Sequence, residues 1–284
     1  MSAEETDMKV GFIGLGSLGE GIARRIARSG FDLVAYDISP AAMTAFDEPG
    51  VEKTPDAIDV ARKVEALCVC VRMDADVQDL VGDGALFKAL GDGGLFIIHS
   101  TVSPDLAREV AKAASAFGVS VIDAGVSGGS PAALRGELSV YVGGEPEAIE
   151  RARPLMESYA KSILCLGPSG RGMEGKLLNN LVSIANYGMA AAILDLGQQL
   201  GFDRDELRAA LMAGSAEGFA MKVAPGLLRP EGAAAMRQLL GKDVDHAREL
   251  ASNTDPSMAA LLHAADSMLD RLSNIQAAAE QARQ

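Results

Sequence analysis

The chain has 284 residues, 48% of them hydrophobic, which is enough for one large domain or two of ordinary size. Its 26 basic and 39 acidic residues give a net charge of −13, which argues against binding to nucleic acid or to an anionic membrane surface, because both need a basic face. Three cysteines and three histidines show no metal-like spacing, so we expect no metal, no disulfide framework and a reducing, cytoplasmic environment. The N-terminal segment, residues 1–7, is acidic and polar, unlike a signal peptide.

A glycine-rich loop follows the first predicted strand, residues 9–13, and helical spacing continues from it to residue 29. The loop is a G-x-G-x-x-G motif made of Gly14, Leu15, Gly16, Ser17, Leu18 and Gly19. Its glycines permit a tight turn, let the backbone approach a pyrophosphate, and let helix and strand pack closely. We therefore predict a dinucleotide site, with the diphosphate against the N-terminus of the helix.

An acidic residue ends the second predicted strand, residues 32–36. The Asp37 carboxylate can accept hydrogen bonds from the adenosine ribose hydroxyls and would repel a 2′-phosphate. The next residues, Ile38 and Ser39, supply no arginine to offset that repulsion. This pattern favours NAD over NADP. The alternative is a glycine turn that serves only for packing.

Strand and helix patterns alternate as far as residue 167. The further predicted strands are residues 66–71, 95–98, 119–122, 138–142 and 162–166, and the predicted helices are 55–63, 104–117 and 146–159. Near-continuously apolar strands are typical of a parallel sheet covered on both faces. We predict an α/β, doubly wound Rossmann-type domain over residues 1–167, with its ligand at the carboxyl ends of the strands.

Two segments at strand ends are candidates for ligand contact, residues 99–104 and 123–130. In the second, Gly128 and Gly129 can present consecutive backbone N–H groups and Ser127 a hydroxyl, which together suit a carboxylate. Ordinary turns are the alternative, because glycine, serine and proline gather in turns.

Only helical spacing appears in residues 168–284, so we predict an all-helical C-terminal domain that begins with a long interdomain helix over about residues 172–200. At about 100° per residue, its polar residues fall within an arc of about 120°. They are Lys176, Asn179, Asn180, Ser183, Asn186 and Tyr187. A transmembrane helix over residues 177–194 is disfavoured because the segment carries three asparagines.

Further helices are predicted over residues 204–213, 232–252 and 256–279, and we expect part of their apolar surface to meet a second copy of the chain. From the residues alone, Lys242-Asp243 within the second of these helices is read as a solvated pair.

The features above, in this order, resemble the β-hydroxyacid dehydrogenase family, the 3-hydroxyisobutyrate dehydrogenase-like group that is related to 6-phosphogluconate dehydrogenase. The resemblance is carried by the glycine loop, Ser100-Thr101 before Pro104, Asp123-x-x-Val-Ser-Gly-Gly129, Gly172-x-x-x-Lys176-x-x-Asn-Asn180 and Lys242-Asp243.

The resemblance implies reversible hydride transfer between NAD and the hydroxyl carbon of a β-hydroxy carboxylate. By it, Lys176 is the catalytic lysine, assisted by Asn180, while Ser127, Gly128 and Gly129 bind the substrate. Asn179, on the same polar stripe, is a further candidate for substrate binding. Four further positions then approach the cofactor, and these are Val71, Arg72, Thr101 and Lys242. The helical domain of the family commonly mediates dimers or tetramers.

The chain also departs from the family pattern. It has Gly125 where relatives often have proline, Val71-Arg72 where many have Leu-Pro, and Ala192 where an acid is common; a C-terminal Gly-x-Gly-x-x-Asp is absent. The alternative functions are an imine reductase-like enzyme and a catalytically silent dinucleotide-binding module. Both typically lack the lysine, so Lys176 argues against them.

Overall fold

The chain folds into two compact units, Met1–Lys176 and Leu177–Gln284, in a computed structural model that describes residues 8–227, 229–251 and 257–281. Residues 1–7, which we found unlike a signal peptide, lie outside this description. We expected the boundary between residues 167 and 168. The contacts divide the chain later, within the long helix α9 (Arg171–Gln199), because the first turns of that helix pack on the sheet of the first unit.

The first unit is built on one eight-stranded sheet in the order β3-β2-β1-β4-β5-β6-β7-β8. The strands are β1 Lys9–Ile13, β2 Asp32–Tyr36, β3 Glu52–Lys53, β4 Ala66–Val69, β5 Leu95–Ile98, β6 Ser120–Ser127, β7 Leu138–Gly144 and β8 Ala160–Gly167. Every neighbouring pair is parallel except β6 and β7, which are antiparallel, so the predicted parallel sheet contains one antiparallel pair. The connection from β6 to β7 is too short for a crossover over the sheet, which takes about a dozen residues or more.

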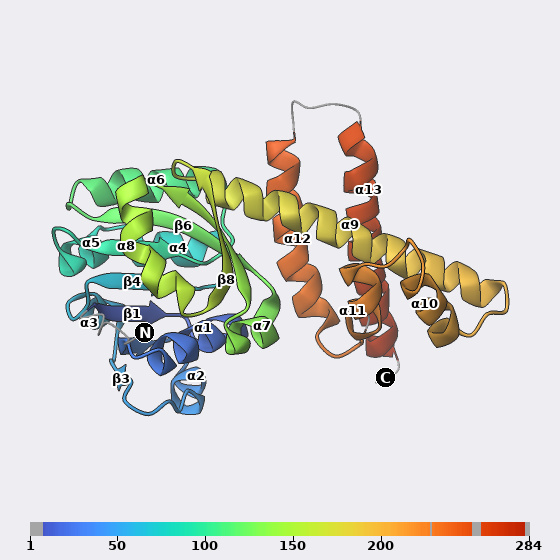
Figure 1. Ribbon diagram of the computed structural model, residues 1–284, viewed down its shortest axis with the longest axis horizontal. Helices are drawn as coiled ribbons and strands as arrows, with labels where there is room; N and C mark the ends of the chain where they lie inside the picture. Colours follow the sequence, from blue (N-terminus) through green and yellow to red (C-terminus); the bar gives the residue numbers. More distant parts are fainter. Residues whose placement is uncertain (1–7, 228, 252–256, 282–284) are drawn as a thin grey trace. The chain divides into compact units, whose positions relative to one another are not determined.

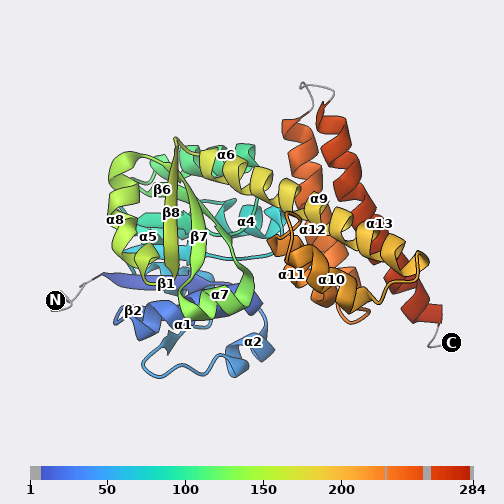
Figure 2. The ribbon, with the colours of Figure 1, turned by 45° about the vertical axis from the view of Figure 1, so that its right-hand side comes forward.

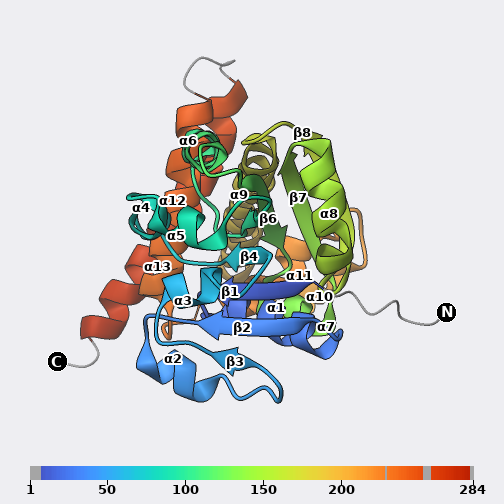
Figure 3. The same ribbon diagram turned by 90° about the vertical axis from the view of Figure 1, so that its left-hand side faces the viewer.

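Helices cover both faces of this sheet, as Figure 3 shows. They are α1 Ser17–Arg28, α2 Pro40–Ala45, α3 Ala57–Ala61, α4 Asp74–Val81, α5 Ala85–Leu90, α6 Pro104–Ser115, α7 Gly129–Arg135 and α8 Pro146–Glu157. Buried side chains of α1, α7 and α8 form one core with the sheet, and those of α3, α4, α5 and α6 form the other. This is the doubly wound α/β architecture that the alternating pattern predicts.

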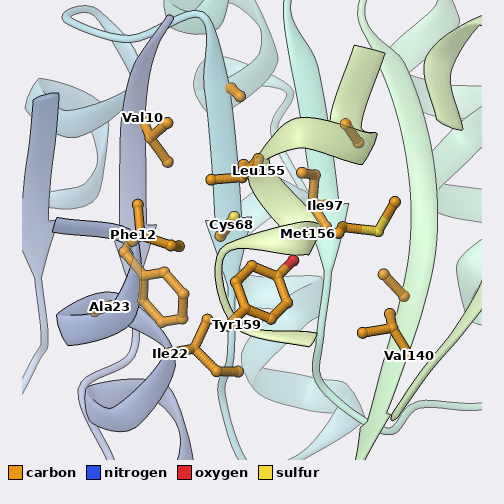
Figure 4. Close-up of a cluster of buried hydrophobic side chains, with 14 of the residues drawn as sticks. Val10, Phe12, Ile22, Ala23, Cys68, Ile97, Val140, Leu155, Met156 and Tyr159 are labelled. Atoms are coloured by element: carbon orange, nitrogen blue, oxygen red, sulfur yellow. The ribbon is translucent and has the colours of Figure 1, made fainter. Parts of the chain in front are cut away.

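A buried histidine, His99, lies against the rings of Phe12 and Tyr159, two residues of the first core. Both rings are labelled in the hydrophobic cluster of Figure 4. The His99 Nδ1 lies 2.9 Å from the carbonyl oxygen of Ala124, and its Nε2 lies 3.2 Å from the Tyr159 hydroxyl. We assign Nδ1 as the donor and Nε2 as the acceptor, because a carbonyl can only accept. Burial lowers the pKa of His99 to about 4, so the ring is neutral around pH 7.

The second unit is entirely helical over its described residues. It contains the rest of α9 together with α10 Arg204–Met212, α11 Phe219–Leu227, α12 Ala233–Leu250 and α13 Ser257–Gln281. The helices α12 and α13 lie side by side (Figures 1 and 2), and a core is shared between them and the α9 residues Leu181 and Ile184. By length and composition α9 could cross a membrane, but these buried residues are those of a core helix.

We predict that His99 makes the free energy of unfolding fall as the pH drops from about 6.5 to about 4. The unfolded imidazole binds a proton from its ordinary pKa of 6.5 downward, whereas the folded one does so only near 4. The slope is at most about 1.4 kcal/mol per pH unit. A series of urea unfolding curves for wild type and for the double variant His99→Phe/Tyr159→Phe measures it.

Tyr159→Phe is the matched control, since it keeps the imidazole. Asp123 has the opposite effect in all three proteins, because burial raises its folded pKa to about 6 and stability is lost as pH rises from 3.8 to that value. The difference between the control and the double variant therefore isolates His99. Equal pH slopes for these two proteins would contradict the prediction.

Candidate active site

The predicted cofactor loop lies at the carboxyl end of β1, where the sheet order places a neighbouring strand on each side. Gly14 has a φ of +98°, and a Cβ there would lie 2.3 Å from the Cys70 carbonyl oxygen, so no other residue fits this turn. A Cβ at Gly16 would meet nothing within 4 Å, and both Gly16 and Ser17 are exposed. The loop therefore has the tight turn and the open backbone that a pyrophosphate needs, and its residues fit NAD.

Asp37 joins the glycine loop to the end of β2. Its Oδ2 accepts a hydrogen bond of 2.6 Å from the Leu15 N–H, and its Oδ1 accepts one of 2.7 Å from the Ser39 N–H. A carboxylate has about four lone-pair sites, so two remain for the hydroxyls of a ribose. Asp37 can therefore shape the loop and bind the cofactor at the same time.

The loops after β4 and β5 are joined in the same way. The Val71 N–H donates a 2.8 Å hydrogen bond to the Ser100 Oγ, which places Val71 and Thr101 on neighbouring loops at the same edge of the sheet. Arg72 is exposed at this edge. Val71 lies beside the glycine loop, since a Cβ built on Gly14 would be 3.4 Å from the Val71 Cγ1. Arg72 and Thr101 lie in the loops after β4 and β5, at the same end of the sheet.

The predicted carboxylate site also lies beside the glycine loop. Ser127 ends β6, and Gly128 and Gly129 are exposed. The next residue, Ser130, has its Oγ 2.5 Å from the Ser17 Oγ, and α1 and α7 lie side by side (Figures 1 and 2). A carboxylate held at Ser127–Gly129 would therefore be close to a cofactor held by the loop.

Lys176 lies against the same strand. A Cβ built on Gly125 would be 2.9 Å from both the Cβ and the Cγ of Lys176, so the lysine stem packs directly on the backbone of β6. Gly125 and Ser127 are two residues apart and face the same side of the sheet. Glycine at position 125, where relatives often have proline, therefore leaves room for the stem of Lys176. The lysine residue is only 7% exposed.

Asp123, also on β6, is a residue to which the motif pattern assigned no role. It is 1% exposed, and its two carboxylate oxygens accept hydrogen bonds from the N–H groups of Gly170 (2.7 Å) and Met173 (2.8 Å) at the start of α9. Burial raises the pKa of Asp123 to about 6, although these N–H groups and Arg108 act in the opposite direction. The sequence does signal this role, because Asp123 directly follows an apolar predicted strand. A carboxylate buried there needs hydrogen-bond donors from another segment.

The remaining predicted positions lie in the second unit, where four of its polar residues form a chain. The Asn180 Nδ2 donates to Asp243 Oδ2 at 2.6 Å, Asn179 donates to Asn180 at 3.1 Å, and Lys242 lies 3.8 Å from Asp243. The side chains of Lys242 and Asp243 are only 9% and 4% exposed. The interpretation of this pair as solvated is therefore wrong, because both groups are buried and linked to the asparagines.

A pocket of about 410 Å³ also lies in this unit. It is lined by three residues of the polar stripe, Ser183, Asn186 and Tyr187, and by the segment 216–221. The polar stripe of α9 thus opens in part onto a pocket. No group of three or more metal-binding side chains occurs in the parts of the chain that the structure describes.

Comparison with known families identifies the first unit. Residues 9–167 match the model of the NAD binding domain of 6-phosphogluconate dehydrogenase. This match, which spans the sheet from β1 to β8, confirms the prediction of an NAD-binding Rossmann-type domain.

Two curated relatives come from Pseudomonas aeruginosa. An NAD-dependent L-serine dehydrogenase is 31% identical over 254 residues, which are 86% of this chain and 85% of the relative. A 3-hydroxyisobutyrate dehydrogenase is 33% identical over 216 residues, which are 75% of this chain and 72% of the relative.

Solved structures extend the similarity to both units. A 3-hydroxyisobutyrate dehydrogenase from Salmonella typhimurium has a TM-score of 0.81 at 26% identity and covers 95% of each chain. The protein Psf3, in complex with NADP+ and 2-OPP, has a TM-score of 0.82 at 26% identity and covers 94% of this chain and all of its own. An imine reductase from Streptomyces aurantiacus, with a TM-score of 0.65 at 17% identity, shares the fold alone and covers 94% of this chain and 98% of its own.

We predict that Asp37→Asn weakens NAD binding by about 10- to 100-fold, because hydrogen bonds to a charged group contribute about 1.5–3 kcal/mol. The variant keeps the size of the side chain but loses the charge and one acceptor. Quenching or enhancement of NADH fluorescence on titration measures the dissociation constant. Asp32→Asn, at the exposed start of the same strand, is the control. An unchanged dissociation constant for NADH would contradict the assignment of Asp37.

Proposed function

Because this chain belongs to the β-hydroxyacid dehydrogenase family, we propose that it interconverts a small β-hydroxy carboxylate and its carbonyl product, with Lys176 as the general acid and base. It is an oxidoreductase that acts on CH–OH groups, and its cofactor is NAD. The observation that carries the proposal is that the stem of Lys176, on α9, packs on β6 at Gly125, two residues before Ser127.

The substrate carboxylate would be held by the N–H groups of Gly128 and Gly129 and by the Ser127 hydroxyl. Gly125, on which the lysine stem packs, and Ser127 are about 6.6 Å apart along β6, so the stem lies close to this cradle. The curated relatives named above, an L-serine dehydrogenase and a 3-hydroxyisobutyrate dehydrogenase, support a small β-hydroxy carboxylate as the substrate.

In the oxidation direction, the amine of Lys176 takes the proton of the substrate hydroxyl, and in reduction its ammonium returns that proton to the forming alcohol. When bound, NAD accepts the hydride from the hydroxyl carbon. Lys176 is only 7% exposed, which keeps bulk water away from the proposed acid and base. Asn180, four residues further along α9 and therefore on the same face of the helix, would orient the hydroxyl, with its own amide held by Asp243.

We predict that Lys176→Ala lowers kcat by about 10²- to 10⁴-fold, the usual contribution of a positioned acid or base, and leaves NADH binding within about twofold. Lys176→Arg should be nearly as inactive, because a guanidinium keeps the charge but does not release its proton. The measurement is NADH formation with L-serine and 3-hydroxyisobutyrate, each with NAD and with NADP. Lys112→Ala, an exposed lysine on α6, is the control.

Wild-type turnover by Lys176→Ala would exclude this role for the lysine. Reduction of cyclic imines by the wild type, without oxidation of any hydroxy acid in the panel, would favour the imine-reducing alternative. Tight NADH binding without either activity would favour a silent dinucleotide-binding module.

We further propose that the chain forms a homodimer or homotetramer through the second unit. Five apolar side chains of α9 are between 42% and 54% exposed, and at about 100° per residue they fall within about 60° of one another. They are Leu178, Val182, Met189, Ile193 and Leu196. A continuous apolar stripe of this kind is typical of a helix that packs against a partner helix.

We predict that Ile193→Glu shifts the sedimentation coefficient toward a smaller species, because it places a charge in the middle of the stripe. Ala210→Glu on α10 adds the same charge at an exposed position outside it and should sediment like the wild type. A monomeric wild type, or an unchanged oligomer in the Ile193 variant, would contradict this interface.

A further inference from the structure

The helix that carries Lys176 begins without a cap of its own. Its N-cap residue is Gly170, which has no side chain, and its third residue is Met173, which has no hydrogen-bond acceptor suited to a backbone amide. In a capping box these two positions satisfy each other's N–H groups with a Ser or Thr and a Glu or Gln. The sequence of α9 therefore leaves both amides to be satisfied from outside the helix.

Asp123 supplies both missing acceptors from the middle of the sheet. Its Oδ1 accepts the Gly170 N–H at 2.7 Å and its Oδ2 accepts the Met173 N–H at 2.8 Å. These are the two amides that a capping box would satisfy. A carboxylate also interacts favourably with the positive end of the helix dipole. One buried side chain thus fixes the first turn of α9 to β6.

The same turn is in backbone contact with two strands. A Cβ built on Gly172 would lie 2.5 Å from the Asp123 carbonyl oxygen and 2.6 Å from both the Gly143 nitrogen and the Tyr141 carbonyl oxygen. Gly143 in turn faces Asp123 across β6 and β7. With no side chain between them, helix and sheet can keep this contact only if the helix neither slides nor tilts.

Lys176 follows Met173 by three residues, about one turn, so it extends the same face of the helix along the strand. Its stem meets Gly125, two residues after Asp123 on the same side of β6. Asp123 and Gly125 therefore hold two successive turns of α9. An ion pair between Arg108 on α6 and Glu174 further holds the start of α9 against the first unit.

We propose that Asp123 is a positioning residue for the Lys176 acid/base: by capping α9 from the sheet, it sets where the lysine amine stands relative to Ser127–Gly129. This inference rests on the proposed function of Lys176. It assigns Asp123 no contact with substrate or cofactor.

The test compares Asp123→Asn with the wild type in both the Lys176 and the Lys176→Ala backgrounds. An amide keeps one acceptor but turns an N–H₂ group toward the second backbone N–H, so the helix start must move. A misplacement of about 1 Å can lower a rate by about 10²-fold, and we expect kcat to fall by about 10- to 100-fold. The KM for NAD should stay within about twofold of the wild type.

In the Lys176→Ala background, Asp123→Asn should change the residual rate, followed as slow NADH accumulation, by less than about twofold, because the group that Asp123 positions is gone. A purely structural role would lower the residual rate by the same factor in both backgrounds. That outcome would overturn the inference, and so would wild-type kcat in Asp123→Asn.

Two further variants complete the test. Gly172→Ala leaves the Asp123 carboxylate in place but pushes the first turn of α9 away from the strands, so it should also lower kcat by about 10- to 100-fold. A wild-type kcat for Gly172→Ala would overturn the inference even if Asp123 variants fold poorly. Asp203→Asn is the matched control, because Asp203 caps α10 by accepting the N–H groups of Asp205 and Glu206. It should keep wild-type kcat. Wild-type turnover by Lys176→Ala would instead overturn the proposed function itself.

Discussion

The candidate site depends on one contact, the attachment of the first turn of α9 to the carboxyl half of β6. A buried carboxylate is costly unless its oxygens are satisfied, and a helix start is costly unless its amides are. Asp123 and the residues Gly170 and Met173 satisfy each other, so two requirements that would each destabilise the fold are met by one interaction. Because that interaction sits next to Gly125, it also fixes the base of the Lys176 side chain.

Hydrogen bonds between loops organise the rest of the strand-end surface. Asp37 joins the loop after β1 to the end of β2, Ser100 joins the loops after β4 and β5, and the Ser17 and Ser130 hydroxyls join α1 to α7. Each is a short polar side chain that accepts or shares a hydrogen bond with a neighbouring loop. A cofactor can therefore bind to loops that are held in place before it arrives, which lowers the entropy that binding must overcome.

The helix α9 carries a polar stripe on one side and an exposed apolar stripe on another. The polar stripe includes Lys176, the asparagine pair linked to Asp243, and the residues Ser183, Asn186 and Tyr187, which line the pocket in the second unit. The exposed apolar residues of α9 are centred about 110° around the helix from the centre of the polar stripe. A long helix with a polar side and an apolar side suits both a site and an interface, which is why its overall composition resembles that of a membrane-spanning helix.

The sequence by itself determined seven of the eight described strands, the glycine loop, the acid at the end of β2, the long α9 and the family, because each is encoded by local spacing or by a short motif. It did not determine the two-residue strand β3, the antiparallel return of β7, the burial of Lys242 and Asp243, or the partners of Asp123. Those depend on which segments meet in space. A carboxylate in a strand and two amides far along the chain carry no mutual periodicity, and only packing reveals that each is the other's hydrogen-bond partner. The tertiary structure decided that the lysine is held from the sheet and not by its own helix.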